Sequence, residues 1–409
     1  MTDTAVRPTP ASALVRYRLS PWWARVLVIF VASRIITTII LLAFASVQAA
    51  NAWTGAHPDY FSFAGIWDGT WYRIVAASGY PAVLPLTTDG HITQNAWAFL
   101  PAYPMVVGAL SNITHLTFNV VGVFVSVGFA AGAALVFYKL LLPHLGSSTS
   151  LFGVVLLCVA PLSPILQVDY AESMMLFFLA LSLLYLQRRQ YWIMLLPVAV
   201  MAFTRPTGLA FALAIGLHVI YRYAVKRRDG FSLSEQASAI AATIIAGLLG
   251  YAWPAIAGAV TGVPDAYTAT ELSWRADYIG WVALVPFQPW VQGAEWWVGR
   301  AGIGGNAVAI VLLLVVVGLF AALLFTPIVK RIGVDMRLWV ASWAIYLLAV
   351  FFPQSSVFRL LVPLFPLLGA LAIPRWRSYR VALVIALILG QIGWIYIAYW
   401  VDGYDWTPP

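Results

Sequence analysis

The stretch AVAIVLLLVVVGLFAALLF, residues 307–325, decides the fold class. It contains no charged residue and is about as long as the roughly 20 residues that a membrane-spanning helix needs. Of the 409 residues, 62% are hydrophobic and 9% are charged, against roughly 45–50% and about 25% in soluble domains. Such an excess of apolar residues requires lipid as a solvent, so we expect an integral membrane protein.

Further apolar runs predict an all-α bundle of about 11 membrane-spanning helices, with 10 to 12 as the range. The predicted spans are 22–49, 117–141, 151–168, 171–187, 191–205, 207–225, 237–260, 303–326, 337–353, 357–374 and 380–401. The apolar segment 96–110 contains two prolines and is short for a span. We expect it to be a juxtamembrane or re-entrant helix, with a twelve-span arrangement as the alternative.

Basic residues set the predicted orientation, because Lys and Arg gather in the inner loops of membrane proteins. With the N-terminus inside, all three lysines (Lys139, Lys226 and Lys330) and most arginines fall on the inner side, whereas most acidic residues fall outside. The tail 401–409 is then outside. We expect a single domain, 1–409, in a bacterial plasma membrane. Two long outer segments, 51–116 and 261–302, are candidates for function because long loops in compact domains tend to be functional.

The strongest local signal is FAGIWDGTWYRIVAASGY, residues 63–80, in the first outer segment. It places Asp68 between Trp67, Trp71 and Tyr72. A carboxylate in such an aromatic setting is a candidate general base, and aromatic faces suit sugar rings. The alternative is an interfacial amphipathic helix that is anchored by its aromatic residues.

Four more charged residues lie at the outer ends of predicted spans. Asp169 and Glu172 stand at the mouth of the fourth span, where acids also suit a helix N-terminus. Arg205 and Arg359 are cations on the acidic side of the membrane. Arginine binds phosphate through two parallel hydrogen bonds, and the alternative is an ion pair with a nearby carboxylate.

Five short elements, in order along the chain, resemble the signature of the PIG-V mannosyltransferase family. They are Trp67-Asp68 with Trp71-Tyr72 and Gly79-Tyr80, then Ala98–Pro104 (AFLPAYP), Tyr170-Ala171-Glu172-Ser173, Arg205-Pro206-Thr207-Gly208, and Phe358–Pro366 (FRLLVPLFP). The sequence departs from the family pattern at Leu100, Ala171 and Leu360. Together the elements cover most of the chain from about 60 to 370.

The resemblance implies a GT-C fold and transfer of a hexose, mannose first of all, from a polyprenyl-phosphate sugar to a glycolipid or cell-envelope acceptor on the extracytoplasmic face. It implies inversion at the anomeric carbon with Asp68 as the catalytic base. The implied substrate-binding residues are Trp67, Trp71, Tyr72, Asp169, Tyr170, Glu172, Arg205 and Arg359. The expected partners are the lipid-linked donor, a lipid-linked glycan acceptor and membrane lipids.

Other function classes are less consistent with the sequence. No Walker, Rossmann or other glycine-rich nucleotide loop is present, and we expect no nucleic-acid partner. His57, His91 and His115 lack zinc-ligand spacing; no cofactor is required, although a divalent cation at Asp68 is left open. The rival class is a polytopic transporter or lipid flippase, which also suits charges in the membrane and proline-broken spans. It predicts an internal repeat, which the sequence does not show.

Overall fold

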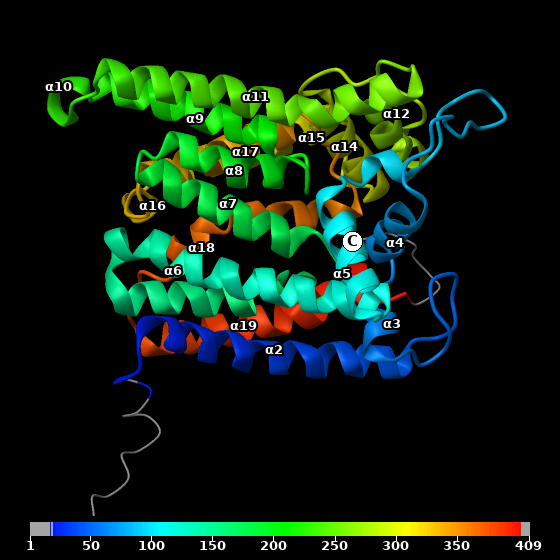
Figure 1. Ribbon diagram of the computed structural model, residues 1–409, viewed down its shortest axis with the longest axis horizontal. Coiled ribbons are helices and arrows are strands. Elements are labelled where there is room, and N and C mark those ends of the chain that lie inside the picture. Colours follow the sequence, from blue (N-terminus) through cyan, green and yellow to red (C-terminus); the bar gives the residue numbers. More distant parts are fainter. Residues whose placement is uncertain (1–16, 18, 402–409) are drawn as a thin grey trace, which may run out of the picture.

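In the computed structural model, which describes Tyr17 and residues 19–401, the chain is a bundle of α-helices (Figure 1). Within this part of the chain there is no β-strand, only an isolated bridge between Leu86 and Ile92. The predicted all-α class is therefore confirmed. The predicted inner N-terminal segment and outer tail fall mainly on residues 1–16 and 402–409, which lie outside the described residues.

The long helices of the bundle are α2 (Trp22–Val47), α6 (Phe118–Val159), α7 (Glu172–Gln187), α8 (Tyr191–Ala202), α9 (Gly208–Ala224), α11 (Leu233–Thr261), α15 (Asn306–Leu324), α17 (Val334–Val350) and α19 (Arg377–Trp394). Shorter elements connect them: α3 (Tyr60–Ala64), α4 (Asp68–Ser78), η1 (Ala96–Ala98), α5 (Ala102–Thr114), η2 (Ser163–Gln167), α10 (Lys226–Asp229), α12 (Ala266–Ser273), α13 (Ala276–Ile279), α14 (Gln288–Arg300), α16 (Pro327–Lys330), η3 (Ser355–Leu364), α18 (Pro366–Leu371) and η4 (Ile395–Tyr399).

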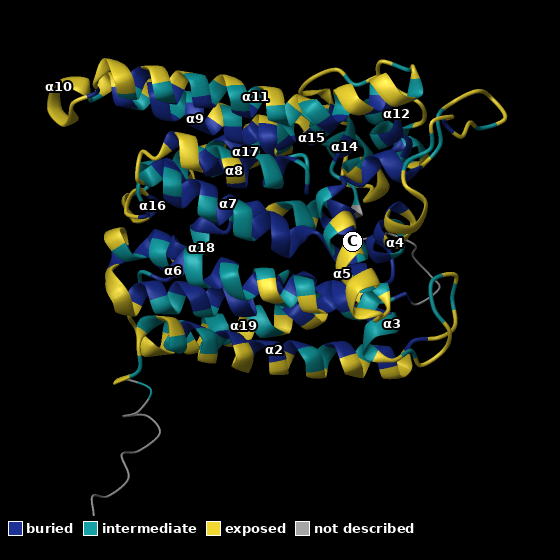
Figure 2. Cartoon of the chain, in the orientation of Figure 1, coloured by how far each residue is buried: buried dark blue, intermediate teal, exposed yellow. Residues whose placement is uncertain are grey.

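The outer surface of the bundle is apolar. Among the described residues, five helices are long and apolar enough to cross a membrane, namely α2, α6, α11, α15 and α19 continued by η4. Only Ala309 and Leu324 of α15 are buried, and Figure 2 shows exposed faces along α2 and α11 as well. Rows of exposed Leu, Ile and Val need hydrocarbon as their solvent, so the chain is a multi-pass integral membrane protein.

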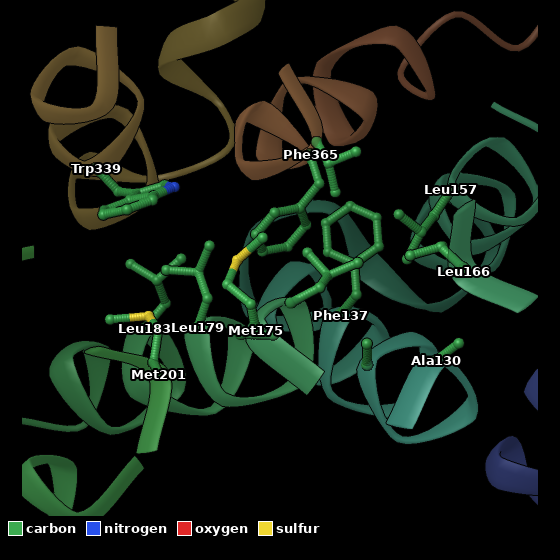
Figure 3. Packing of buried hydrophobic residues seen from close by; sticks show 14 of the residues in the cluster. Ala130, Phe137, Leu157, Leu166, Met175, Leu179, Leu183, Met201, Trp339 and Phe365 are labelled. Atoms are coloured by element: carbon green, nitrogen blue, oxygen red, sulfur yellow. The ribbon is translucent and has the colours of Figure 1, made fainter. Parts of the chain in front are cut away.

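The core lies between α6, α7 and α17, with the segment around Phe365 closing it. Phe137 of α6, Met175 of α7 and Trp339 of α17 are buried there (Figure 3). Phe137 meets Phe365 edge to face, with ring centroids 5.1 Å apart. Such close packing fixes the helices that carry the charged residues described below.

Two predicted spans differ from the observed helices. The predicted spans 117–141 and 151–168 match the two helical parts of α6 on either side of a kink at Gly146, but the second part ends at Val159 rather than at 168. Pro161 and Pro164 follow, and proline disfavours continuation of a helix. The predicted span 357–374 is a 3₁₀ segment, η3, followed by the six-residue α18, because Pro363 and Pro366 each lack a backbone N–H donor.

The short helices gather at the two ends of the bundle. Helices α3, α4, α5, α12 and α14 lie together at one end, and α10 and α16 lie at the other (Figure 1). Helix α5 has 13 residues and is roughly 20 Å long, whereas the hydrocarbon core is about 30 Å thick. It packs against α4 and one part of α6 rather than crossing the bundle, as expected for a juxtamembrane helix. The first group of helices forms the candidate site.

Candidate active site

Asp68 is held in place by a sharp turn before α4. Trp67 has a positive φ of 58°, and its indole N–H donates to the carbonyl of Tyr399 at 2.8 Å. The chain then enters α4 at Asp68, whose side chain lies in the first turn and is buried. The backbone N–H of Asp68 donates to the Tyr170 hydroxyl at 3.3 Å. Contacts on both sides of the turn therefore fix the position of this carboxylate.

Two arginines and two carboxylates meet at this point. Asp68 Oδ2 accepts a hydrogen bond from Nη2 of Arg205 at 2.9 Å and another from Nη1 of Arg359. The same Arg205 nitrogen donates to Oε1 of Glu172 at 2.5 Å. Nη1 of Arg359 lies 4.0 Å from Oε1 of Glu172. We call these four residues the ionic cluster.

Different parts of the fold bring these side chains together. Glu172 begins α7, Arg205 lies in the turn between α8 and α9, and Arg359 lies in η3. All four side chains are largely shielded from solvent, with exposed fractions from 4% to 15%. Charges in such a place need partners of opposite sign, which the cluster provides. The ion-pair contacts expected as the alternative are present, and they leave the arginines able to bind a ligand.

Several polar atoms of the site have no hydrogen-bond partner within the described part of the chain. They are Oε2 of Glu172, Nε of Arg205, Nε of Arg359 and the hydroxyl of Tyr72, and all four atoms are buried. Buried polar atoms are normally paired, and each guanidinium has five N–H donors. Since each arginine reaches the carboxylates through one terminal nitrogen, other N–H groups are free to bind a polar ligand such as a phosphate.

Tyr72 and Tyr170 line the cluster from two sides. The Arg205 guanidinium lies over the Tyr72 ring, 5.7 Å from its centroid. Burial raises the pKa of the Tyr72 hydroxyl well above its ordinary value, so this group stays protonated and can donate a hydrogen bond. Burial also raises the pKa of Tyr170. The structure thus brings two predicted substrate-binding tyrosines to the predicted base.

The two predicted tryptophans lie outside the ionic cluster. Trp67 is buried against Trp53, with ring centroids 5.2 Å apart. Trp71 stacks on Phe99 at 5.3 Å, and Trp274 meets its ring edge to face at 5.7 Å. Trp71 is partly exposed and Trp67 is not. Sugar contacts of both residues stay predictions, and their observed contacts join the first outer segment to the rest of the bundle.

Asp169 is also separate from the ionic cluster. It is fully buried in the turn between η2 and α7, where Oδ1 accepts a hydrogen bond from the Tyr103 hydroxyl at 2.8 Å. Its backbone N–H donates to Ala64 at 3.0 Å. Burial raises the pKa of the Asp169 carboxyl well above its ordinary value. Its role in substrate binding stays a prediction, and its contacts here are those of a buried acid that joins α5 to the turn.

Asp169→Asn is expected to fold, because an amide resembles the neutral acid in size and shape. The wild-type carboxyl ionises in the unfolded chain near pH 4 but at a higher pH in the fold. The neutral Asp169 carboxyl therefore contributes to the free energy of unfolding at acid pH, and this contribution is lost as the pH rises. Thermal unfolding from pH 4 to pH 8 should show the Asn variant gaining stability relative to wild type. A difference in unfolding temperature between the two proteins that stays the same at every pH would contradict this.

The sequence analysis missed one acidic residue of the site. Glu271, in α12 of the second outer segment, is subject to the charges of Arg205, Arg359 and Asp68. Burial raises the pKa of the Glu271 carboxyl to about 7. A signal was available, because Tyr267, Thr270, Glu271 and Trp274 follow helical spacing. Nothing in the sequence placed that face of the helix against the first outer segment.

The described part of the chain contains no preformed set of metal ligands. Nowhere among these residues do three or more His, Cys, Asp or Glu side chains come together as candidate ligands. The positive charge of the site comes from Arg205 and Arg359. The expectation that no cofactor is required stays a prediction.

Fold and site together define a polytopic α-helical membrane protein with a buried ionic cluster at one end of its bundle. No protein family model matches the sequence, and no curated protein matches it. Among solved structures, the chain is similar to the oligosaccharyltransferase of Archaeoglobus fulgidus tethered to an acceptor peptide that contains an NVT sequon, with 13% identity and a TM-score of 0.41.

A second structure is the Archaeoglobus fulgidus oligosaccharyltransferase AglB in complex with an inhibitory peptide and a dolichol-phosphate, with 12% identity and a TM-score of 0.42. Each comparison covers 92% of this chain and 56% of the other protein. The chain therefore spans little more than half the length of these neighbours.

Proposed function

We propose that the protein is a membrane glycosyltransferase of the GT-C kind that transfers a hexose from a polyprenyl-phosphate sugar to a glycolipid or cell-envelope acceptor. The sequence resemblance favours mannose. One observation carries the proposal: η3 places the guanidinium of Arg359 in the ionic cluster, while the neighbouring Phe358 lines an apolar groove. A lipid phosphate has the same two parts, a charged head and a hydrocarbon chain.

The apolar groove has a volume of about 600 Å³ and lies between the end of α6, η3 and α19. Its lining is almost entirely hydrocarbon and includes Leu157, Leu166, Leu361 and Trp394. An isoprenoid chain gains roughly 0.8 kcal/mol for each buried CH₂ group, and such a groove offers no site to a free nucleotide sugar. These properties support a polyprenyl chain as the occupant.

In the proposed reaction, the two arginines of the ionic cluster bind the donor and Asp68 acts on the acceptor. Free N–H groups of Arg205 and Arg359 bind the donor phosphate. Oδ2 of Asp68 is held by the arginines, and its other oxygen, Oδ1, takes the proton of the acceptor hydroxyl. The acceptor oxygen forms a bond to the anomeric carbon as the bond from that carbon to the phosphate oxygen breaks. Polyprenyl phosphate leaves with the electron pair, stabilised by the arginines, and attack from the opposite face inverts the anomeric carbon.

The distribution of charge supports an extracytoplasmic active site. Lys226 in α10 and Lys330 in α16 lie at the end of the bundle opposite the ionic cluster (Figure 1). Lysine and arginine mark the inner ends of membrane helices. The ionic cluster would then face outward, where lipid-linked sugars meet cell-envelope acceptors.

Donor binding can be tested without turnover. We expect polyprenyl phosphate to raise the temperature of thermal unfolding of the purified protein, because a ligand that binds only the folded state stabilises it, by about 2.7 kcal/mol at 100 times Kd. Polyprenol without phosphate and inorganic phosphate without a chain serve as controls and should each have a much smaller effect. Equal shifts for the lipid with and without phosphate would contradict a role for the arginines in donor binding.

A further inference from the structure

Helix α12 places part of the second outer segment over the ionic cluster. Nδ2 of Asn95 donates to Oγ1 of Thr270 at 2.9 Å. Trp274, directly after α12, lies edge to face against Trp71 of α4 at 5.7 Å. These contacts join α12 to η1 and to the helix that begins with Asp68. The second outer segment is therefore part of the site.

The helical repeat sets the direction of Glu271. Residues three and four positions apart share one face of an α-helix, so Glu271 lies on the same face as Tyr267, Thr270 and Trp274. Thr270 and Trp274 contact the first outer segment, and Glu271 therefore faces it too. The Glu271 side chain is half-buried, and Tyr267 lies one helical turn before it in α12.

The groups around Glu271 differ from those around the other two carboxylates of the site. Asp68 and Glu172 each have an arginine within 3 Å, whereas no arginine or lysine within the described part of the chain lies within 4 Å of Glu271. Arg205, Arg359 and Asp68 act on it electrostatically from farther away, and the charge of Glu271 in turn acts on Tyr346 in α17. Its oxygens are therefore free to accept hydrogen bonds from a ligand.

We propose that Glu271 binds the hydroxyl groups of the sugar that the donor carries, and so helps to determine which sugar is transferred. This inference rests on the proposed function. If Arg205 and Arg359 hold the donor phosphate, the sugar ring lies next to them and close to α12, because its anomeric carbon is bonded to a phosphate oxygen. A carboxylate accepts hydrogen bonds from two neighbouring hydroxyls, and such charge-assisted bonds are roughly twice as strong as neutral ones. The acceptor glycan offers the same chemistry, and the experiment separates the two.

The test is steady-state kinetics of Glu271→Gln with donor and acceptor varied separately. We expect the KM for the donor to rise roughly 10-fold or more, because hydrogen bonds to a charged group are lost. The KM for the acceptor and kcat should change less than about threefold. The ratio of kcat/KM between donors that share a lipid but differ in sugar should fall. Asp277→Asn, which removes an exposed carboxylate six positions along the same segment, serves as the matched control and should be silent.

The pH dependence of the KM for the donor distinguishes sugar binding by Glu271 from a purely structural role, which would leave it unchanged. The donor is a phosphodiester and does not titrate near neutral pH. Since the pKa of Glu271 is raised to about 7, the KM of the wild-type enzyme for the donor should fall as the pH rises through that value. The tyrosines and arginines around Glu271 keep their charge state there. The Gln variant should show a flat profile.

Three results would overturn the inference. They are an unchanged KM for the donor, a rise in the KM for the acceptor instead, and a loss of kcat alone, which would indicate proton transfer. Thermal unfolding of the Gln variant shows whether it is folded, and Glu271→Asp should recover part of the donor affinity. If the wild-type enzyme transfers no sugar from any polyprenyl-phosphate donor, the proposed function fails, which is a different outcome from an active enzyme that is insensitive to Glu271→Gln.

Discussion

Asp68→Asn is expected to lower kcat by roughly 10²-fold or more, the usual contribution of a general base. Asparagine keeps the size of the side chain and an oxygen that the arginines can reach, but it cannot take the proton of the acceptor. The KM for the donor should change little, because Arg205 and Arg359 are still present to bind the phosphate. Asp68→Glu should recover only part of the activity, since a displaced carboxylate misses the geometry of attack.

Two acids of the same outer segment provide controls for Asp68. Asp59 caps α3, where its side chain accepts from the backbone N–H of Ser62 at 2.8 Å, and asparagine caps a helix equally well. Asp89 is exposed in a turn. Asp59→Asn and Asp89→Asn should therefore be active. Thermal unfolding must accompany the assay, because removal of one partner of a buried ion pair can cost about 3 kcal/mol. A folded Asp68→Asn enzyme with wild-type turnover would end the assignment of Asp68 as the base.

Arg359→Lys is expected to raise the KM for the donor by roughly 10-fold or more, because lysine keeps the charge but loses the planar fork that binds phosphate through two hydrogen bonds. Arg205→Lys should act in the same direction and should also reduce stability, since Nη2 of Arg205 joins Asp68 to Glu172. The measurement is kcat and KM for the donor, together with thermal unfolding.

The matched control for both arginines is Arg73→Lys. Arg73 is exposed on α4, the helix that begins with Asp68, and forms no part of the ionic cluster. This variant should behave like wild type. Unchanged donor kinetics in folded Arg359→Lys and Arg205→Lys enzymes would mean that the two arginines serve only as structural partners of the carboxylates.

The sequence predicted the members of the ionic cluster but not their contacts. Asp68, Arg205 and Arg359 stood out because charged residues are rare in an apolar chain and are costly in a membrane. Arg205 and Arg359 lie 137 and 291 positions from Asp68 along the chain. A local pattern holds no information on which of such distant residues meet, because that depends on how the helices pack.

Features without a hydropathy signal were missed. The segment 357–374 is apolar enough to suggest a span, yet its prolines produce η3 and the short α18. Hydropathy predicted the two helical parts of α6 on either side of Gly146, but it extended the second part past Val159, where the helix ends. Glu271 is one acid in a polar loop, and only the packing of α12 against η1 and α4 brings it to the site. Asp169 shows the reverse case, since its place near Glu172 in sequence suggested a shared role that its contacts with Tyr103 do not indicate.

The most direct test of the central claim is a transfer assay. Purified protein is incubated with radiolabelled polyprenyl-phosphate-mannose and a total membrane lipid extract, and the lipids are then separated. We predict a new labelled glycolipid, the release of an equal amount of polyprenyl phosphate, and formation of both products at a rate lower by roughly 10²-fold or more with Asp68→Asn. If folded protein leaves all the label in the donor, or moves the donor across a bilayer without changing it, the protein is not the proposed glycosyltransferase.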